Sequence, residues 1–222
     1  MSAVTLYAAS VAALSDPERY AEACRLVSAA RRERLNRLSR QPDRCRSLAA
    51  ELLLRRALKD CGLQPPFAFR LSPAGKPYLP DAPRFSLSHS GVHVLCAVSE
   101  REVGCDVERI RPVSPKLAER FFCPEEAAEI AAAPTEEARL RSFFRFWTLK
   151  ESYVKALGTG MRLPFRSFRL RLEPAPALVS PQDAGRFAFR EFTALPGYCC
   201  ALAVEGDSSA VEWIAVPPEQ LL

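Results

Sequence analysis

Lysine, histidine and glycine are scarce in this chain. Its 222 residues include 9 glycines and 2 histidines, and few of the 31 basic residues are lysine: Lys59, Lys76, Lys116, Lys150 and Lys155. So little glycine excludes a collagen-like fibre. The arginine excess is mostly a matter of composition, but each remaining lysine is of interest because its ammonium group is a compact charge with a tunable pKa.

Long apolar runs and metal-binding cysteine motifs are also missing. No stretch approaches the roughly 18 apolar residues of a membrane helix, and the first basic residue, Arg19, comes too late for the charged start of a signal peptide. The 8 cysteines form no Cys-x-x-Cys motif and no cluster with histidine, which argues against a zinc site. We therefore expect a cytoplasmic protein with reduced thiols that is neither exported nor membrane-bound.

The composition is that of a globular protein, with 48% hydrophobic and 26% charged residues. Caps and apolar faces predict helices after Asp16-Pro17 and Ser28, between Asp43 and Gly62, and after Ser114-Pro115, Cys123-Pro124 and Thr135. Strands are predicted at residues 4–8, 92–98, 102–108, 165–172, 186–193, 198–204 and 210–216. Residues 63–84, apart from an extended piece around residues 67–71, and the polar run 85–91 are expected to be loops. Each half mixes a long helix with several strands, which predicts an α+β fold.

Two carboxylates share one face of the strand predicted at residues 102–108. Alternation places Gly104, Asp106 and Glu108 on the same side. With about 7 Å between their Cα atoms, the two carboxylates repel each other unless a cation lies between them, and hard divalent ions prefer oxygen ligands. Gly104 would leave room for a ligand to approach. A solvated polar face explains this segment alone equally well.

A second polar stripe lies along one side of the last predicted helix. Trp147, Glu151 and Lys155 are spaced i, i+4, i+8 and lie along one side of it. A Glu–Lys pair that merely stabilises a solvated helix is the ordinary explanation. However, the helix is aromatic and apolar around this stripe, and a buried carboxylate requires a partner or a metal. Glu151 can therefore add a third oxygen ligand beside Asp106 and Glu108, with Lys150 and Lys155 facing an anionic substrate.

Three further segments suit phosphate groups. The run 85–91 contains Ser88 and His89, which as neighbours cannot form a catalytic triad, and the chain has no Gly-x-Ser-x-Gly motif. Gly75-Lys76-Pro77 places a lysine on a tight turn. A basic cluster comprises Arg25, Arg31, Arg32, Arg34, Arg37, Arg40, Arg44 and Arg46. It could be a solvated face or bind RNA, but it lacks stacking aromatics, and arginine also matches the phosphates of a small molecule.

Together and in this order, these motifs resemble the 4′-phosphopantetheinyl transferases of the surfactin-synthetase-activating type. The resemblance rests on residues 75–77 and 85–90, and above all on the pairing of Gly104-Cys105-Asp106-Val107-Glu108 with residues 147–155. It implies a monomer of two similar α+β lobes in a pseudo-twofold arrangement, with the active site in the cleft between them. We place the N-terminal lobe at residues 1–102 and the C-terminal lobe at residues 103–222.

The resemblance also implies an activity. Phosphopantetheine would pass from coenzyme A to a serine of an acyl or peptidyl carrier protein, releasing 3′,5′-ADP, with no role for nucleic acid or a membrane. Asp106, Glu108 and Glu151 would bind Mg²⁺, Glu151 would act as the base, Lys155 would stabilise the leaving phosphate, and Lys150 would hold the pyrophosphate. The remaining coenzyme A contacts would come from Arg31, Arg34, Arg46, Ser47, Gly75, Lys76, Ser88 and His89.

Some positions depart from the family pattern. Arg31 and Arg34 replace lysines, Cys105 replaces a branched aliphatic residue, and Cys45 stands where some relatives have histidine. The apolar segment 113–122 is expected to dock the carrier protein. Two alternatives stay open: an arginine-rich RNA-binding module, and a Mg²⁺-dependent nucleotide pyrophosphohydrolase that uses the same carboxylates with water as the nucleophile.

Overall fold

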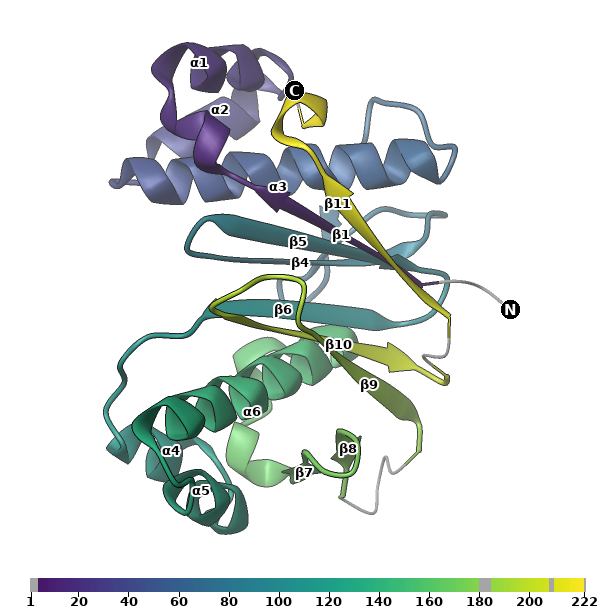
Figure 1. The fold of residues 1–222 in the computed structure, drawn as a ribbon. Coiled ribbons are helices and arrows are strands. Elements are labelled where there is room, and N and C mark those ends of the chain that lie inside the picture. The colour runs from purple at the N-terminus through teal and green to yellow at the C-terminus, as the bar shows by residue number, and fades with distance from the viewer. Residues whose placement is uncertain (1–3, 180–184, 208–209, 222) are drawn as a thin grey trace.

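The protein consists of two sheet–helix units stacked so that the sheets are inside and the long helices outside (Figure 1). This arrangement comes from a computed structural model, which describes residues 4–179, 185–207 and 210–221. The mixed α+β fold expected from the sequence is confirmed. No helix in the described part of the chain is long and apolar enough to cross a membrane.

The N-terminal unit is a four-stranded sheet in the order β11-β1-β5-β4, covered by the long helix α3 (Gln41–Asp60). Its strands are β1 (Val4–Ser10), β4 (Arg84–Ser90), β5 (His93–Ser99) and β11 (Val211–Val216). Two shorter helices, α1 (Pro17–Arg25) and α2 (Ala29–Asn36), lie beyond α3, and a small hairpin joins β2 (Arg70–Leu71) to β3 (Pro77–Tyr78).

The C-terminal unit repeats this plan with fewer strands. Its sheet has the order β6-β10-β9, formed by β6 (Val103–Arg109), β9 (Phe187–Phe192) and β10 (Tyr198–Glu205), and the long helix α6 (Glu136–Leu157) covers its outer face. Two helices, α4 (Lys116–Phe121) and α5 (Pro124–Ala131), precede α6. A two-stranded piece, β7 (Leu170–Arg171) with β8 (Ala177–Leu178), follows it.

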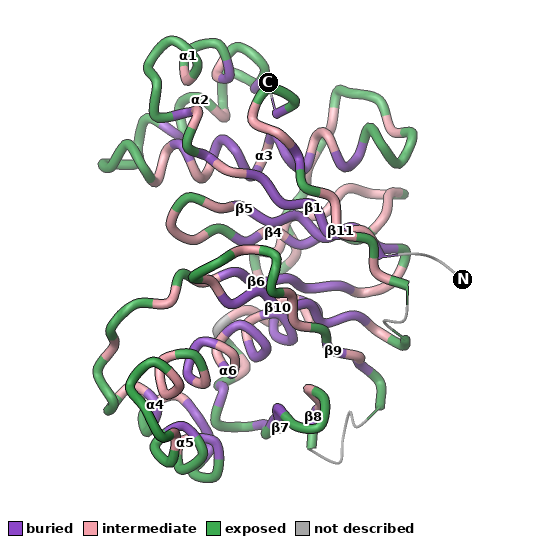
Figure 2. Tube along the Cα trace, viewed as in Figure 1, coloured by how far each residue is buried: buried purple, intermediate pink, exposed green. Residues whose placement is uncertain are grey.

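Three apolar cores, counted over the described residues, hold the layers together. One lies between α3 and the first sheet, a second lies between α6 and the second sheet, and a third fills the space between the sheets. In the third core, alternate residues of β6 such as Val103, Cys105 and Val107 pack against Leu6 and Leu95 of the other sheet. Buried backbone accordingly follows the strands and the inner faces of the two long helices (Figure 2). The opposite face of β6 is left to meet α6.

Most of the predicted elements are confirmed, including three of the helix caps. Asp16 accepts hydrogen bonds from Glu18 and Arg19 backbone N–H groups, and Ser28 and Thr135 cap their helices in the same way. Three predictions are wrong. Asp43 lies inside the first turn of α3 rather than at its cap. Of residues 165–172 only Leu170–Arg171 form a strand, after a 3₁₀ turn at Phe165–Ser167. Residues 85–90 of the polar run belong to the edge strand β4 rather than to a loop.

The chain crosses back between the units at its C-terminal end. Strand β11 pairs in parallel with β1, from Val4 beside Val211 to Ala9 beside Val216. Residues 211–216 therefore lie in the N-terminal sheet, although the sequence-based boundary assigned them to the lobe 103–222. The reason is physical: a parallel pairing between chain ends leaves no signal in the local pattern, because both strands are simply apolar and alternating.

Candidate active site

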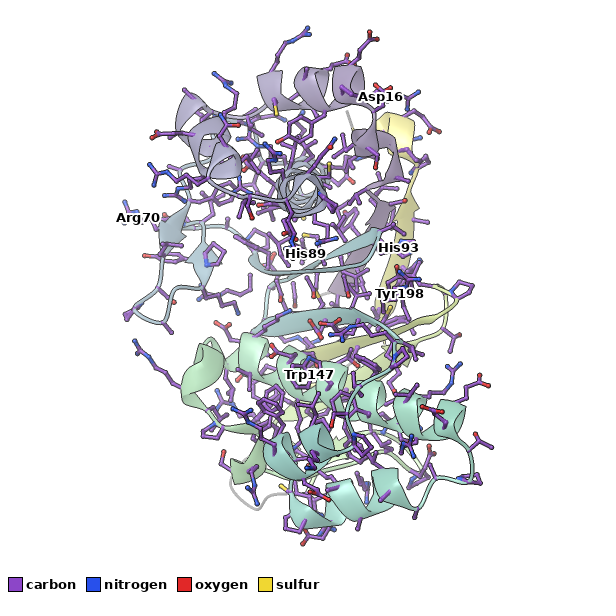
Figure 3. The ribbon with its side chains drawn as sticks, turned by 90° about the vertical axis from the view of Figure 1, so that its left-hand side faces the viewer. Asp16, Arg70, His89, His93, Trp147 and Tyr198 are labelled. Carbon is purple, nitrogen blue, oxygen red and sulfur yellow. The ribbon has the colours of Figure 1, made fainter. Side chains whose placement is uncertain are left out.

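A cleft of about 1130 Å³ lies between the two units. Its walls come from α2, α3 and β4 on one side and from β6 and α6 on the other. Figure 3 shows His89 on the N-terminal side and Trp147 on α6 below it. The cleft therefore joins motifs that are far apart in the sequence.

The carboxylate strand β6 forms the centre of this cleft. Asp106 and Glu108 both line it, whereas Val103, Cys105 and Val107 point into the core between the sheets, as alternation predicted. Gly104, however, does not leave room for a ligand. A Cβ atom there would lie 1.9 Å from the carbonyl oxygen of Ser152 and 2.5 Å from the backbone nitrogen of Ala156. Glycine is needed because the backbone of α6 packs directly on β6.

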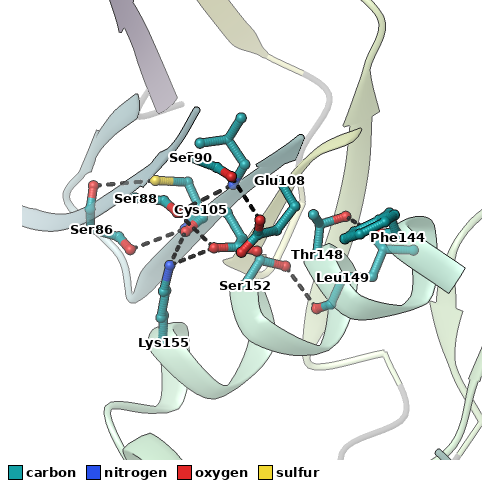
Figure 4. Close-up of polar contacts among 12 residues, drawn as sticks. Ser86, Ser88, Ser90, Cys105, Glu108, Phe144, Thr148, Leu149, Ser152 and Lys155 are labelled. Atoms are coloured by element: carbon teal, nitrogen blue, oxygen red, sulfur yellow. Dashed lines mark hydrogen bonds and ion pairs between the residues drawn. The ribbon is translucent and has the colours of Figure 1, made fainter. Parts of the chain in front are cut away.

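This close packing brings two charged side chains of α6 to the carboxylates. Glu151 and Lys155 both line the cleft, and the Nζ atom of Lys155 lies 2.7 Å from Oδ1 of Asp106 (Figure 4). Burial and the nearby charge of Asp106 raise the pKa of Glu151. Burial works against the charge on Lys155, but Asp106 outweighs it, so the pKa of Lys155 is also raised. The result is a carboxyl group suited to accept a proton beside an ammonium group that keeps its own.

Strand β4 contributes hydroxyl groups to the same carboxylates. The Oγ atom of Ser88 donates a hydrogen bond of 2.6 Å to Oδ1 of Asp106, and that of Ser90 donates one of 2.7 Å to Oε2 of Glu108. His89, between them in the sequence, points to the other side of β4 and lines the cleft. The His89 side chain is exposed to the open cleft, but partial desolvation by the cleft walls lowers its pKa, which favours the neutral ring.

The basic cluster reaches the cleft through two of its members, Arg31 and Arg34 of α2. The guanidinium of Arg31 is held by α3: its Nε atom lies 2.6 Å from Oε2 of Glu51, and its NH2 group donates to the hydroxyl of Ser47 at 2.8 Å. Glu51 in turn pairs with Arg55 one turn further on. Arginine side chains fixed in this way form a rigid site for oxyanions such as phosphate.

The cleft collects most, but not all, of the residues predicted from the sequence. Those that line it are Arg31, Arg34, Ser47, Ser88, His89, Asp106, Glu108, Glu151 and Lys155. Gly75 and Lys76 line a smaller neighbouring cavity of about 260 Å³, which Lys155 and Pro77 also reach. Arg46 is not among the described residues that line the cleft, since its guanidinium bonds to Asp43 and to the carbonyl oxygen of Gly91.

Lys150 is placed elsewhere, and its predicted contact with pyrophosphate is wrong. Its side chain is 0% exposed, and its Nζ atom lies 2.9 Å from Oε2 of Glu126 on α5. It also donates to the carbonyl oxygens of Phe165 and Phe168 at 2.7 and 2.6 Å. Lys155 comes five positions after Lys150, which corresponds to about 140° around the helix, so the two lysines face different surroundings.

Other residues that line the cleft were not predicted from the sequence. Phe67 and Phe69 line its apolar end, and Glu51 and Arg55 line its basic wall. The i, i+4 spacing of Glu51 and Arg55 was a signal for a pair on α3. Phe67 and Phe69 lie in the extended piece expected within the proline-rich segment, and the local sequence carries no sign of what this piece covers.

The carboxylates do not yet converge as a preformed metal cage. Among the described residues, no group of three His, Cys, Asp or Glu side chains lies close enough to hold a metal ion. Yet Oδ2 of Asp106 is buried and has no hydrogen-bond partner in the part of the chain that the structure describes. A buried carboxylate oxygen without a donor is costly, and a cation would satisfy it. This donor set fits a hard divalent ion that takes its other ligands from substrate and water.

Comparison with known proteins identifies the family of this chain. Residues 102–203 match the model of the 4′-phosphopantetheinyl transferase superfamily. 4′-Phosphopantetheinyl transferase Sfp of Bacillus subtilis (strain 168) is 30% identical over 202 residues, which cover 88% of this chain and 90% of that protein. The chain belongs to the 4′-phosphopantetheinyl transferases of the Sfp type. It is thus an enzyme that transfers phosphopantetheine to carrier proteins.

Other relatives are similar to this transferase over most of their length. The 4′-phosphopantetheinyl transferase HetI of Nostoc sp. is 35% identical over 184 residues, covering 78% of this chain and 76% of that protein. A crystal structure of Thermotoga maritima holo-[acyl-carrier-protein] synthase aligns with a TM-score of 0.39 and 28% identity, covering 48% of this chain and 63% of the solved one.

Proposed function

We propose that this transferase moves the 4′-phosphopantetheine group of coenzyme A to a serine hydroxyl of an apo acyl or peptidyl carrier protein, releasing 3′,5′-ADP. The observation that carries the proposal is the meeting of Asp106, Glu108, Glu151 and Lys155 with the arginines of the other unit in one cleft. All of these residues come from one chain, so we also propose that the enzyme acts as a monomer.

The residues divide into a metal site and an anion site. Asp106, Glu108 and Glu151 would hold Mg²⁺, which neutralises the pyrophosphate charge when bound. Arg31, Arg34, Ser47 and His89 would bind the 3′-phosphate and ribose, with Gly75 and Lys76 at the adjoining edge of the nucleotide and Arg46 supporting this wall from behind. Ser88 is left out of this set, because its hydroxyl donates to Asp106.

The protein's own groups account for the proton and the leaving group. The carboxylate of Glu151 would accept the proton of the serine hydroxyl, directly or through a water, as the serine oxygen forms its bond to the β-phosphorus. The bond from that phosphorus to the bridging oxygen breaks, and the electron pair leaves with 3′,5′-ADP. Lys155, held by Asp106, would stabilise the charge on this phosphate.

The predicted docking segment for the carrier protein needs one change. Phe122 is 0% exposed and packs in the C-terminal core, so it cannot be part of a docking surface. Val113, Leu117 and Phe121 pack against the same core and are half-buried. We propose that these three side chains, beside the exposed Lys116 and Arg120, form the contact with the carrier protein.

Intact-mass spectrometry of an apo carrier protein with coenzyme A and Mg²⁺ tests this function. The carrier should gain one phosphopantetheine unit, and a chelator or Glu151→Gln should abolish the gain. Glu137→Gln, an exposed position in the first turn of the same helix, is the matched control and should leave the gain intact. Cleavage of coenzyme A without a modified carrier would favour a pyrophosphohydrolase. Untouched coenzyme A with several carriers would favour a binding module.

A further inference from the structure

The two units meet along a line of serine hydroxyls. Strands β4 and β6 belong to different sheets but lie side by side, each at the edge of its sheet. The Oγ atoms of Ser86, Ser88 and Ser90 on β4 accept hydrogen bonds of 3.0, 3.2 and 3.1 Å from backbone N–H groups of β6, at Cys105, Val107 and Arg109. We call these three serines the serine seam.

Two members of the seam make a second contact that the third does not. Ser88 and Ser90 donate their hydroxyl protons to Asp106 and Glu108, at 2.6 and 2.7 Å. Ser86 also accepts from β6, but the side chain beside it is Cys105, and no described carboxylate accepts from its hydroxyl. A hydroxyl group has one proton. In Ser88 and Ser90, the bond accepted from β6 fixes the oxygen, and the proton points at a carboxylate.

These contacts cross from one unit to the other. The carboxylates stand on β6 of the C-terminal unit, while the hydroxyls stand on β4 of the N-terminal unit. The two carboxylates are negative neighbours on one strand face, and a donated hydrogen bond at each one reduces the cost of keeping both ionised and in place. Groups that bond to metal ligands in this way fix their orientation, and their removal typically lowers metal affinity by about 10–100-fold.

We infer that Ser88 and Ser90 are positioning residues that hold Asp106 and Glu108 for the divalent ion, and so set the metal affinity of the enzyme. This inference rests on the proposed function. It also removes Ser88 from the contacts to the ribose and 3′-phosphate, because a single proton cannot serve both the carboxylate and a phosphate. Ser88 is only 8% exposed, which agrees with a role inside the seam.

The test is Mn²⁺ binding by the enzyme with coenzyme A present, measured from the electron paramagnetic resonance of the free ion. Ser88→Ala and Ser90→Ala should each raise the dissociation constant about 10-fold or more. The matched control is Ser86→Ala, which loses a seam hydrogen bond but no bond to a carboxylate, and should change the constant less than about 2-fold. Ser90→Thr keeps the hydroxyl and should stay near wild type. Thermal melting of each variant checks that it is folded. If Ser88→Ala does not fold, Ser90→Ala at the half-buried position 90 still tests the inference.

The outcomes separate this inference from the proposed function. Equal weakening in all three alanine variants would mean that the seam is only a structural joint, and unchanged constants would mean that the hydroxyls do not set affinity; either overturns the inference while the transfer to a carrier stands. A wild-type enzyme that binds no Mn²⁺ with coenzyme A and modifies no carrier would overturn the proposed function itself. A rise in the Mg²⁺ concentration needed for half-maximal transfer, with the KM for coenzyme A unchanged, would support positioning.

Discussion

Lys150 shows how one side chain in an active-site motif can serve the interior instead. Its ammonium group pairs with Glu126 where the two side chains are 0% and 1% exposed, and Glu126 also accepts from the backbone N–H groups of Cys123 and Leu170. The pair therefore connects α6 to α5 and, through Leu170, to the segment that follows α6. Because the helix is fixed there, Glu151 on its next face is fixed as well.

We expect Lys150→Met to lower the free energy of unfolding by about 3–5 kcal/mol, because Glu126 would keep a buried charge without a partner. Urea denaturation measures this loss. Lys150→Met combined with Glu126→Gln removes both charges and should recover most of it. If the single variant were as stable as wild type but bound coenzyme A weakly, the contact with pyrophosphate would have to be reconsidered.

Gly104 is a second residue whose identity is explained by packing rather than by contact with a ligand. The atoms that a Cβ would meet, 1.9 and 2.5 Å away, are backbone atoms of α6. We expect Gly104→Ala to lower the free energy of unfolding by about 3 kcal/mol or more and to reduce transfer, because α6 must move away and takes Glu151 with it. Urea denaturation and carrier modification measure the two effects. Ser152→Ala should not rescue the variant, since the clash is with the carbonyl oxygen of Ser152. A rescue would contradict this explanation.

At the level of elements, α6 carries Glu151 and Lys155, for which catalytic roles are proposed, and its N-terminal cap is far from them. The hydroxyl of Thr135 accepts from the N–H of Ala138 at 3.1 Å, with Glu136 and Glu137 in the first turn. We expect Thr135→Ala to lower the free energy of unfolding by about 1 kcal/mol and to leave the affinity for coenzyme A unchanged. Thr135→Ser retains the hydroxyl and should match wild type. A loss just as large with serine would show that the cap bond is not the cause.

The sequence predicted those elements whose signals are local. Caps at Asp16, Ser28 and Thr135 located three helices, and strand alternation assigned Asp106 and Glu108 to one face. It missed β4 because Ser86, Ser88 and Ser90 resemble a polar loop. Their hydroxyls are buried by a partner strand, β6, that lies in the other sheet. A contact between sheets cannot be read from the composition of one strand.

The same limit applied to Lys150. Helical periodicity places it on a different side from Lys155, but only the position of Glu126 on α5 shows that the side is buried. The sequence motif alone predicted that both lysines contact the substrate. The structure separates them, because the charge of each lysine goes to the carboxylate that packing brings to it: Glu126 in the interior and Asp106 in the cleft.

Across the whole molecule, three cores stack in series, and each contains a buried thiol. Cys96 lies in the core under α3, Cys199 in the core under α6, and Cys105 and Cys200 in the core between the sheets. Burial raises the pKa of Cys105 to about 11 and those of Cys199 and Cys200 to about 12, and it raises the pKa of Cys96 well above its usual value. Each thiol therefore stays protonated in the folded chain at a pH where an unfolded chain loses the proton.

This difference predicts that stability falls with rising pH. Folded pKa values above the unfolded value mean that the stability is fully present below about pH 9, and is lost as the pH rises toward 11 to 12. Within that pH window, each buried thiol should lower the free energy of unfolding by about 1.4 kcal/mol per pH unit. Urea unfolding in reducing buffer between about pH 7.5 and 10.5 measures the slope. Cys105→Ala and Cys199→Ala lower stability at every pH, but each should make the slope shallower by one thiol. Because neighbouring cores share their sheets, we expect the chain to unfold in a single transition. Each of the two variants should then reduce the pH dependence of that transition by the same amount. An unchanged slope in both variants would mean that other groups cause the alkaline loss.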